Sequence, residues 1–273
     1  MLRDTFDEDA ELYDRARPRY PAPLVAEVAA RAGLGPGRRV LEVGPGTGQL
    51  TVALARLGCR VTAVELGASL AAVTARNLRP FPDAEVVNAP FEHWPLPPEP
   101  YDLMAVATAF HWLDPAVRLP KAAAALRPGG MLAVITTDHV ASETDPAADS
   151  FFHDSQEHYR RWDPATPPGL LLRPAERVTT DTAGLFGPGA AGAEHFGPVT
   201  VGRWTREITY TTDEYIDVLS TYSNHRALQP AARQGLLDAL RDLIDTRYGG
   251  RVTKTYLHEL ITTRLITAHR QPQ

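Results

Sequence analysis

Short apolar runs alternate with helical patterns through the middle of the chain. Apolar runs bounded by turn residues predict buried strands, whereas apolar residues that recur every three or four positions predict amphipathic helices. The predicted strands are 40–43, 60–64, 85–87, 101–107, 131–136, 199–209 and 254–267. The predicted helices include 24–29, 50–57, 68–78, 115–126, 212–228 and 231–248. Strands that alternate with helices predict a doubly wound α/β fold with a parallel sheet.

Two segments depart from this alternation. The N-terminal residues 1–35 are polar and acidic at first and are then interrupted by prolines, so they predict short helices that lead into the first strand. Between 141 and 198, Pro and Gly are too frequent for continuous regular structure, but the aromatic residues are too numerous for a free linker. We expect an ordered insertion there, with a simple surface excursion as the alternative.

Composition narrows the class of protein and its partners. The chain has 273 residues, 28 Lys and Arg against 33 Asp and Glu, and 44% hydrophobic residues. This is typical of a globular protein that can bury a sizeable core. The net charge of −5 gives no electrostatic reason to expect nucleic acid or an anionic membrane as a partner. We therefore expect a small-molecule partner, and a monomer or a homodimer.

Cysteine usage and hydropathy bear on the compartment. Cys59 is the only cysteine, which excludes an intrachain disulfide and a cysteine-based zinc cluster. The N-terminus lacks the apolar stretch of a signal peptide, and no apolar run approaches the roughly 18 residues of a membrane span. No cluster of His, Asp and Glu predicts a metal site. The expectation is a cytoplasmic protein that needs no metal.

The most informative stretch is the loop after the first predicted strand. Residues 44–48 read Gly-Pro-Gly-Thr-Gly and lead from a buried strand directly into a helix. Glycine lets a ligand approach the backbone closely, and open α/β sheets bind ligands at the carboxyl ends of their strands. The third glycine comes one residue earlier than in the dinucleotide fingerprint G-x-G-x-x-G, which argues against a pyrophosphate site. A purely structural turn is the alternative.

An acidic residue stands at the end of the second predicted strand. Glu65 lies 17 residues past the last glycine of the loop. A carboxylate in this place can accept hydrogen bonds from both hydroxyls of a ribose; the alternative is an exposed glutamate at a strand end. Together with the glycine loop, Glu65 predicts an adenosine site.

These motifs, in this order, resemble the class I S-adenosylmethionine-dependent methyltransferases of the small-molecule, type 11-like kind. The matching pieces are the strand and loop at 40–48, Glu65, Tyr-Asp-Leu at 101–103 and Leu-Arg-Pro-Gly-Gly at 126–130. They cover roughly residues 36–137 and are highly specific as a set. The segment 13–21 resembles one that closes over the cofactor in a subgroup, and 221–223 fits that subgroup less distinctively.

The resemblance implies a Rossmann-like seven-stranded sheet whose last strand is antiparallel. It also implies a helical lid over 1–35, a methyltransferase core over 36–140 and 199–273, and an insertion over 141–198 that contributes to the acceptor pocket. The implied cofactor is S-adenosylmethionine, and the product is S-adenosylhomocysteine. The residues expected to bind the cofactor are Tyr13, Arg17, Tyr20, Gly44, Pro45, Gly46, Gly48, Glu65, Leu66, Asn88, Ala89, Pro90, Phe91, Thr108 and Ala109.

Within this set the resemblance assigns roles. The glycines line the methionine and ribose, Glu65 binds the ribose hydroxyls, and Leu66 lies against adenine. The loop 88–91 surrounds the adenine ring, and 108–109 face the methionine. Asn88 stands where many relatives have an aspartate, so backbone groups are the alternative contact for the adenine amino group. Arg17 pairs with the cofactor carboxylate or is simply solvated.

The acceptor is expected beyond the fourth strand, where residues 110–112 read Phe-His-Trp. His111 can act as a general base near neutral pH, or it hydrogen-bonds the cofactor or orders the loop. Trp112 packs against adenosine or the next helix, or it contacts the substrate. The residues expected to line the acceptor pocket are His111, Trp112, His139, Phe151, Phe152, Tyr159, Trp162, Tyr222 and His225.

An aromatic-rich pocket favours a flat, partly apolar acceptor. The leading interpretation is C-, N- or O-methylation of an aromatic or heteroaromatic secondary metabolite, such as an indole, a phenol or a diketopiperazine. The alternative is O-methylation of a small carboxylic acid, for which Arg160, Arg161 or Arg173 should reach the pocket.

Two other classes of protein compete with a methyltransferase. A nicotinamide-dependent oxidoreductase is disfavoured by the early third glycine and by the lack of a Tyr-x-x-x-Lys pair; a non-catalytic cofactor-binding protein of the same fold is the second.

Overall fold

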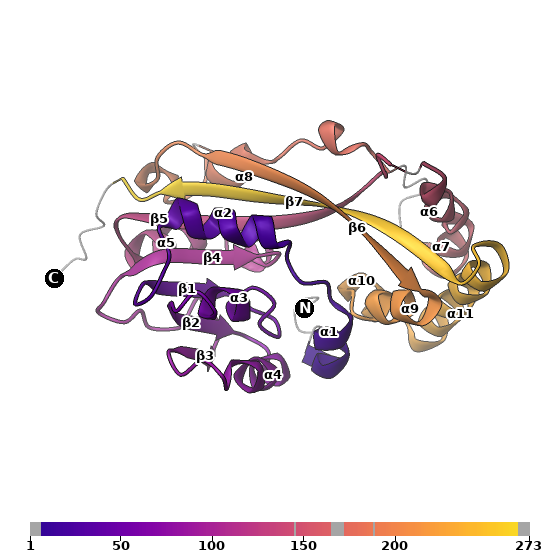
Figure 1. The fold of residues 1–273 in the computed structure, drawn as a ribbon, viewed down its shortest axis with the longest axis horizontal. Helices are drawn as coiled ribbons and strands as arrows, with labels where there is room; N and C mark the ends of the chain where they lie inside the picture. Colours follow the sequence, from indigo (N-terminus) through magenta and orange to yellow (C-terminus); the bar gives the residue numbers. More distant parts are fainter. Residues whose placement is uncertain (1–6, 145, 165–171, 188, 267–273) are drawn as a thin grey trace. The chain divides into compact units, whose positions relative to one another are not determined.

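The fold is an α/β fold built on one mixed sheet. The computed structural model describes residues 7–144, 146–164, 172–187 and 189–266. The strand order in the sheet is β3-β2-β1-β4-β5-β7-β6 (Figure 1). The strands are β1 (Arg39–Val43), β2 (Arg60–Glu65), β3 (Ala84–Asn88), β4 (Tyr101–Ala107), β5 (Leu126–Val140), β6 (Thr200–Thr211) and β7 (Arg251–Arg264). The first five strands pair in parallel and the last strand is antiparallel, so the predicted fold class is confirmed.

The chain divides into two compact units. Unit 1 comprises Met1–Arg17, Thr137–Thr179 and Thr205–Leu257, and unit 2 comprises Pro18–Thr136, Thr180–Trp204 and His258–Gln273. The strands β5, β6 and β7 each contribute residues to both units. The predicted lid, methyltransferase core and insertion stay predictions, because a division of the chain into two compact units does not show what each segment does. Parts of those segments, namely residues 1–6, 165–171, 188 and 267–273, lie outside the described residues.

Unit 2 has a hydrophobic core on each face of its strands. Successive residues of β4 alternate between two clusters: Leu103 and Ala105 belong to one, Met104 and Val106 to the other. This follows from the two-residue period of a strand, and a strand buried on both faces reads as a continuous apolar run. The helices of this unit are α2 (Ala22–Ala32), α3 (Thr51–Ala55), α4 (Ala68–Leu78), η2 (Phe110–Trp112), α5 (Arg118–Ala125), α8 (Thr182–Phe186) and η5 (Ala193–His195).

The register of the sheet brings the functional loops to one edge. Val40 of β1 pairs with Val61 of β2 and with Leu103 of β4, and all three strands run in the same direction. Their carboxyl ends therefore lie together, and the segments that follow them are the glycine loop at 44–48, residues 65–67 and residues 108–112. This edge is where open parallel sheets bind ligands.

Unit 1 is mainly helical. Its helices are α1 (Ala10–Ala16), η3 (Pro146–Asp149), α6 (Ser150–Asp154), α7 (Gln156–Trp162), η4 (Ala175–Arg177), α9 (Thr212–Ser220), α10 (Ser223–Arg226) and α11 (Pro230–Arg247). They pack around a core of aromatic and aliphatic side chains that includes Phe151, Tyr215, Leu236 and Leu240. Within the described ranges, no helix of either unit combines the length and the apolar character that a membrane span requires.

The structure corrects two element boundaries. The predicted continuous helix 212–228 is interrupted after α9, because the Thr221 hydroxyl donates to the Val218 carbonyl and the Thr221 carbonyl accepts a hydrogen bond from Arg17 instead of from the next helical turn. The strand predicted at 131–136 begins earlier, at the start of β5. There the backbone of Gly129 and Gly130 exchanges hydrogen bonds with Leu265.

Candidate functional site

The loop after β1 is held in a conformation that favours glycine. Gly44, Gly46 and Gly48 have φ values of +68°, +64° and +92°, which L-residues with a Cβ rarely adopt. A Cβ on Gly44 would lie 2.7 Å from the Cβ of Ala109. The loops that follow β1 and β4 are therefore in close contact. Thr108 also has a positive φ, +54°, and such outliers cluster at ligand-binding sites.

Two polar side chains of α4 hold the glycine loop in place. The Thr74 hydroxyl donates to the Gly46 carbonyl at 2.7 Å, and the Asn77 amide donates to the Thr47 carbonyl at 2.9 Å. Neither residue was among the predicted site residues. The signal was the i, i+3 spacing of two polar residues on a helix that directly follows Glu65, which places them on one helix face.

The carboxylate of Glu65 faces the glycine loop and is buried, with 6% of the residue exposed. Its Oε2 accepts a hydrogen bond from the Gly46 amide at 3.0 Å, and its Oε1 accepts one from the Gly67 amide at 2.9 Å. Each carboxylate oxygen can accept a second hydrogen bond. The alternative of a solvent-exposed glutamate is therefore wrong, and the carboxylate lies against the glycine loop at the carboxyl end of β2.

The segment after β3 supports the end of β2. The Asn88 side-chain amide donates to the carbonyls of Glu65 and Leu66, each at 2.9 Å. Both amide hydrogens are thereby engaged in the protein, so Asn88 positions the loop. Ala89 also donates its backbone N–H to the Glu65 carbonyl. The Leu66 side chain is 38% exposed and can cover an apolar face of a ligand.

Two further residues of this predicted adenine loop differ in burial. The ring of Phe91 lies in the hydrophobic core of unit 2, so the residue can meet a ligand only through its backbone. Pro90 is half-buried, and its carbonyl accepts hydrogen bonds from the amides of His93 and Trp94, which closes a turn. Their predicted contact with the cofactor stays a prediction.

A buried acid beneath the loop was not among the predicted site residues. Glu42 is on β1, is 1% exposed, and has one carboxyl oxygen without a hydrogen-bond partner. Burial raises its pKa to about 8, and the charge of Glu65 adds to this, although the nearby Thr51 hydroxyl acts in the opposite direction. The signal in the sequence was an acidic residue inside an otherwise apolar strand. A cation bound nearby would stabilise its ionised form.

The segment after β4 combines exposed and aromatic groups. His111 is exposed, and its ring centroid lies 4.7 Å from that of Trp112. Partial desolvation of the ring and the charge of Arg118 lower the pKa of His111, so the ring is neutral at pH 7. The Tyr20 hydroxyl lies 3.4 Å from the Thr108 hydroxyl, which places one predicted lid residue beside this segment.

The other two predicted lid residues belong to unit 1. The Arg17 guanidinium lies 5.0 Å from the ring centroid of Tyr13 and 4.5 Å from that of Tyr222, and it donates to the Thr221 carbonyl at 3.0 Å. Arg17 is half-buried, and its Nε is buried without a hydrogen-bond partner. The alternative of a fully solvated arginine is therefore wrong.

The predicted acceptor residues of unit 1 fall into two groups. Phe151 and Phe152 are buried in the core of the unit, and Trp162 packs so closely on α11 that a Cβ on Gly235 would lie 2.6 Å from its ring. The polar members are His139, Tyr222 and His225. The Nε2 of His225 lies 3.0 Å from the Tyr159 hydroxyl.

The arginines considered for a carboxylate acceptor lie on the surface. Arg160, Arg161 and Arg173 are all exposed. The Arg160 guanidinium donates to the Gln156 carbonyl, and that of Arg161 lies 5.0 Å from the Trp162 ring centroid. Within the described residues, none of these arginines forms a hydrogen bond, an ion pair or a ring contact with the side chain of His139, Tyr222 or His225. In the part of the chain that the structure describes, no group of three or more His, Cys, Asp or Glu side chains is arranged to hold a metal ion.

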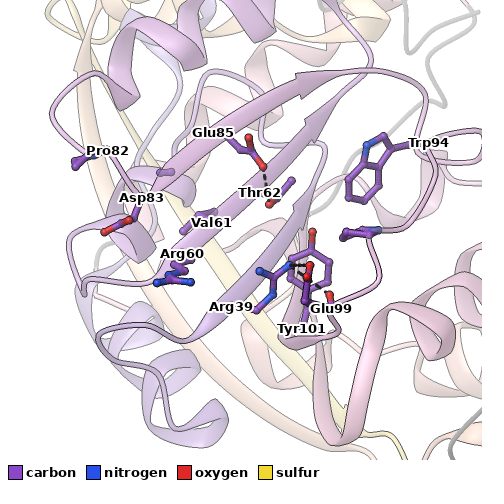
Figure 2. Close-up of a pocket in the computed structure, with 12 residues that line it drawn as sticks. Arg39, Arg60, Val61, Thr62, Pro82, Asp83, Glu85, Trp94, Glu99 and Tyr101 are labelled. Atoms are coloured by element: carbon purple, nitrogen blue, oxygen red, sulfur yellow. Dashed lines mark hydrogen bonds and ion pairs between the residues drawn. The ribbon is translucent and has the colours of Figure 1, made fainter.

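A pocket of about 480 Å³ lies at the amino ends of the parallel strands (Figure 2). Its walls include Arg39, Thr62 and Tyr101, near the beginnings of β1, β2 and β4. Arg39 forms an ion pair with Glu99 at 3.8 Å, and Thr62 donates to Glu85 at 3.2 Å. Figure 2 shows Glu85 turned toward Thr62. Ligand sites of open parallel sheets lie at the opposite, carboxyl edge, so we assign this pocket no function.

Comparison with known proteins decides the family. Residues 41–134 match the sequence profile of a family described as "Methyltransferase domain". An uncharacterised methyltransferase of Mycobacterium tuberculosis is 35% identical over 131 residues, which cover 48% of this chain and 51% of that protein. Residues 41–134 therefore belong to a family of methyltransferase domains. The alignment thus spans about half the length of this relative.

Two other similarities accompany this match. An uncharacterised methyltransferase of Geobacillus kaustophilus is 33% identical over 147 residues, covering 49% of this chain and 66% of that protein. A solved structure described as a type II methyltransferase from Anaeromyxobacter dehalogenans superposes with a TM-score of 0.58 at 22% identity. The superposition covers 93% of this chain and 99% of that chain, and it shows the shared fold.

The residues at this edge fit S-adenosylmethionine, the cofactor that the resemblance implies. Glu65 places a buried carboxylate against the glycine loop, Leu66 offers an exposed apolar surface for adenine, and the orphaned oxygen of Glu42 suits an ammonium group. A side chain at Gly44 would fill the space between the two loops. These four features lie at one edge of the sheet, in unit 2.

Proposed function

We propose that this chain transfers a methyl group from S-adenosylmethionine to a small molecule. The observation that carries the proposal is the buried Glu65 carboxylate, hydrogen-bonded to the glycine loop and to Gly67 at the carboxyl edge of β2. A charged acceptor kept close to a glycine-rich backbone is the arrangement that binds the ribose of a nucleoside in such folds.

In this proposal the chain's own residues bind and orient. Glu65 holds the ribose hydroxyls, Leu66 covers adenine, and Glu42 meets the ammonium of the methionine portion. The bound cofactor supplies a methyl group activated by its sulfonium. The loops hold the methyl donor in a fixed orientation. This lowers the activation barrier, because translational and rotational freedom is lost on binding and not in the transition state.

For the acceptor we propose a flat aromatic or heteroaromatic metabolite. The half-buried rings of Tyr159 and Tyr222 and the polar groups beside them support this choice. O-methylation of a small carboxylic acid is the second candidate. Because Arg160, Arg161 and Arg173 are exposed, they do not support a pocket in which these arginines bind the carboxylate of the acceptor.

Ligand-dependent melting tests the proposal against the oxidoreductase alternative. We expect S-adenosylhomocysteine to raise the melting temperature in differential scanning fluorimetry, because a ligand at 100 times its Kd stabilises the folded state by about 2.7 kcal/mol. NAD(H) should have no effect. Stabilisation by NAD(H) alone would overturn the proposal. Incubation with labelled S-adenosylmethionine and a metabolite library then separates an enzyme from a non-catalytic binder, which would label no acceptor.

Replacing Glu65 by alanine should weaken cofactor binding. Loss of charge-assisted hydrogen bonds to the ribose is expected to reduce the affinity for S-adenosylhomocysteine by about 1.5–3 kcal/mol. Isothermal titration calorimetry measures this change. Glu85→Ala is the matched control, since Glu85 is an exposed glutamate near the start of β3, and it should leave the affinity unchanged. Equal affinities for wild type and Glu65→Ala would remove Glu65 from the site.

For His111 we propose that it contacts and orients the acceptor and is not the general base. Its exposed ring lies 4.7 Å from that of Trp112, centroid to centroid, in the segment that follows β4. His111→Ala should raise the KM for the acceptor about 2- to 10-fold through the loss of one hydrogen bond, with the pH profile of kcat unchanged. Steady-state kinetics across pH checks this. A fall of about 10²–10⁴-fold in kcat, together with loss of the acidic limb, would identify His111 as the base instead.

A further inference from the structure

A second pocket of unit 2, of about 460 Å³, is lined by residues at the N-terminal end of α5 and by residues in and after α8. Its lining residues include Pro115, Ala116, Arg118, Ala183, Gly184 and Ala190. All of them belong to unit 2. The pocket shares no lining residue with the glycine loop or with residues 65–67, so it is a different place from the proposed cofactor site.

Arg118 gives this pocket its charge. Among the described residues that line the pocket, Arg118 is the one with a charged side chain, and the others are alanine, glycine and proline. It is the first residue of α5 and is 9% exposed. Its Nη2 donates to the Gly184 carbonyl at 3.5 Å. Because Gly184 also lines the pocket, the guanidinium end of Arg118 lies at the pocket wall.

The Arg118 guanidinium has no negative partner in the described chain. A guanidinium has five N–H donors. Here Nη1 donates to the Phe110 carbonyl at 3.3 Å, Nη2 donates to Gly184, and Nε is buried without a hydrogen-bond partner. The Phe110 ring, with its centroid 4.4 Å from Cζ, compensates part of the charge. Among the described residues, no carboxylate forms an ion pair with Arg118. A buried charge is costly unless it is compensated, so this pocket favours an anion.

The acidic residues that precede the two lining segments are engaged elsewhere. Asp114 accepts a hydrogen bond from the Ala116 amide at 2.8 Å. Asp181 is the N-cap residue of α8 and accepts one from the Gly184 amide at 2.7 Å. Both carboxylates therefore serve backbone amides, and neither compensates the charge of Arg118.

The two walls of the pocket are packed closely against each other. Gly192 has φ of +84°, and a Cβ there would lie 2.7 Å from Pro120 of α5. The rings of Phe110 and Phe186 are stacked with their centroids 6.0 Å apart. The segment that contains α8 is thus held on α5 by direct contacts. A pocket with walls held in this way is formed before a ligand arrives, which lowers the cost of binding.

We propose that this pocket binds a small organic anion whose carboxylate or phosphate group lies at the Arg118 guanidinium. A guanidinium matches the paired oxygens of both groups with parallel N–H donors. The alanine side chains and Pro115 offer an apolar surface to the rest of the ligand. The N-terminal end of α5 adds to the attraction, because the helix dipole favours negative charge there.

A bound anion would also affect His111. Arg118 donates to the carbonyl of Phe110, the residue that precedes His111. The charge of Arg118, after desolvation, lowers the pKa of His111. An anion at Arg118 offsets this charge, so its binding should raise the pKa of His111. The inference goes beyond the proposed function, because the binding of an anion requires no methyl transfer.

Nuclear magnetic resonance of the full-length chain tests the pocket with defined probes. Butyrate and inorganic phosphate carry the two candidate groups, and butyramide is the uncharged analogue of butyrate. We expect butyrate, phosphate or both to shift the backbone amide signals of Gly184 and Ala190 in a saturable way, whereas butyramide should not. The anion that saturates identifies the preferred group. Shifts that fail to saturate with both anions, or an equal response to butyramide, overturn the proposal.

Variants of the pocket assign the binding to Arg118. Arg118→Gln should weaken binding of the probe about 10- to 100-fold through loss of charge-assisted hydrogen bonds. Ala183→Glu leaves Arg118 in place and should weaken it at least about 5-fold, because like charges at close range repel even in water. Ala26→Glu is the matched control, since Ala26 is an exposed alanine of α2 outside the pocket lining. If Arg118→Gln does not fold, Ala183→Glu decides: an affinity equal to that of Ala26→Glu overturns the proposal.

The imidazole signals of His111 give an independent readout. A saturating probe should raise the pKa of His111 in wild type and leave it unchanged in Ala183→Glu at the same probe concentration. An unchanged pKa in wild type contradicts the location of the anion at Arg118. Failure of S-adenosylhomocysteine to bind would contradict the proposed function, and it leaves the amide titration of this pocket unaffected.

Discussion

Gly44→Ala should destabilise the protein by about 2–5 kcal/mol and abolish detectable cofactor binding. The new Cβ would lie 2.7 Å from the Cβ of Ala109, in a backbone conformation with φ of +68°. Overpacking costs about 1–3 kcal/mol, and a left-handed conformation adds about 1–2 kcal/mol for a residue with a Cβ. Because the contact joins the loops after β1 and β4, any relief moves the backbone of the binding edge. Urea unfolding and calorimetric titration with S-adenosylhomocysteine measure the two effects.

Gly37→Ala separates the steric contribution from the conformational one. Gly37 also belongs to unit 2 and has φ of +78°, but a Cβ there meets no atom within 4 Å. We expect it to lose about 1–2 kcal/mol of stability from the backbone conformation alone, with unchanged cofactor affinity. If Gly44→Ala binds cofactor as tightly as Gly37→Ala, the two loops do not form the cofactor site.

Glu42→Gln should stabilise the protein without cofactor, and more so as the pH rises. The unfolded state loses this proton near the ordinary pKa of 4.5, whereas the folded state keeps it up to about pH 8. Between these values the unfolded state binds fewer protons, so the stability of wild type falls with rising pH. At 1.36 kcal/mol per pH unit, the loss between pH 5 and 7.5 is about 3 kcal/mol. Glutamine has no such proton and should remove this pH dependence.

Chemical denaturation at pH 5 and pH 7.5 measures the Glu42 contribution. Glu157→Gln is the control, because Glu157 is an exposed glutamate on α7 and should leave the pH dependence of wild type unchanged. A wild-type stability that does not decline between these pH values, or the same decline in Glu42→Gln, would contradict the protonated state of Glu42. Calorimetry in buffers of different ionisation enthalpy adds a second readout: binding of an ammonium-bearing ligand should release a proton in wild type and not in Glu42→Gln.

Local patterns were sufficient to predict the sheet and to single out the glycine loop and Glu65, which the structure brings into contact. The apolar run 101–107 became β4, and the periodic stretch 68–78 became α4, with the same bounds. Gly44, Gly46 and Glu65 were found because strand, loop and acid follow one another along the chain. The hydrogen bond between Gly46 and Glu65 joins residues that are only 19 positions apart in the sequence. Such a separation lies within a single βαβ unit.

Contacts between distant segments could not be predicted in this way. The sequence contains no Tyr-x-x-x-Lys pair, but the fold brings Lys254 to Tyr222 from 32 residues away, and Arg17 reaches Thr221 from 204 residues away. The same contact interrupts the predicted helix 212–228. The aromatic side chains of Phe151 and Phe152 were expected at the acceptor, yet their burial follows from packing against helices that lie far along the chain.

The central claim is that the edge formed by the glycine loop and Glu65 binds the adenosyl moiety of the methyl donor. A crystal structure of the chain with S-adenosylhomocysteine tests it most directly. We predict both ribose hydroxyls within hydrogen-bonding distance of the Glu65 carboxylate and the adenine ring against Leu66. A nucleoside bound at any other place, with this edge filled by the protein's own side chains, would contradict the claim.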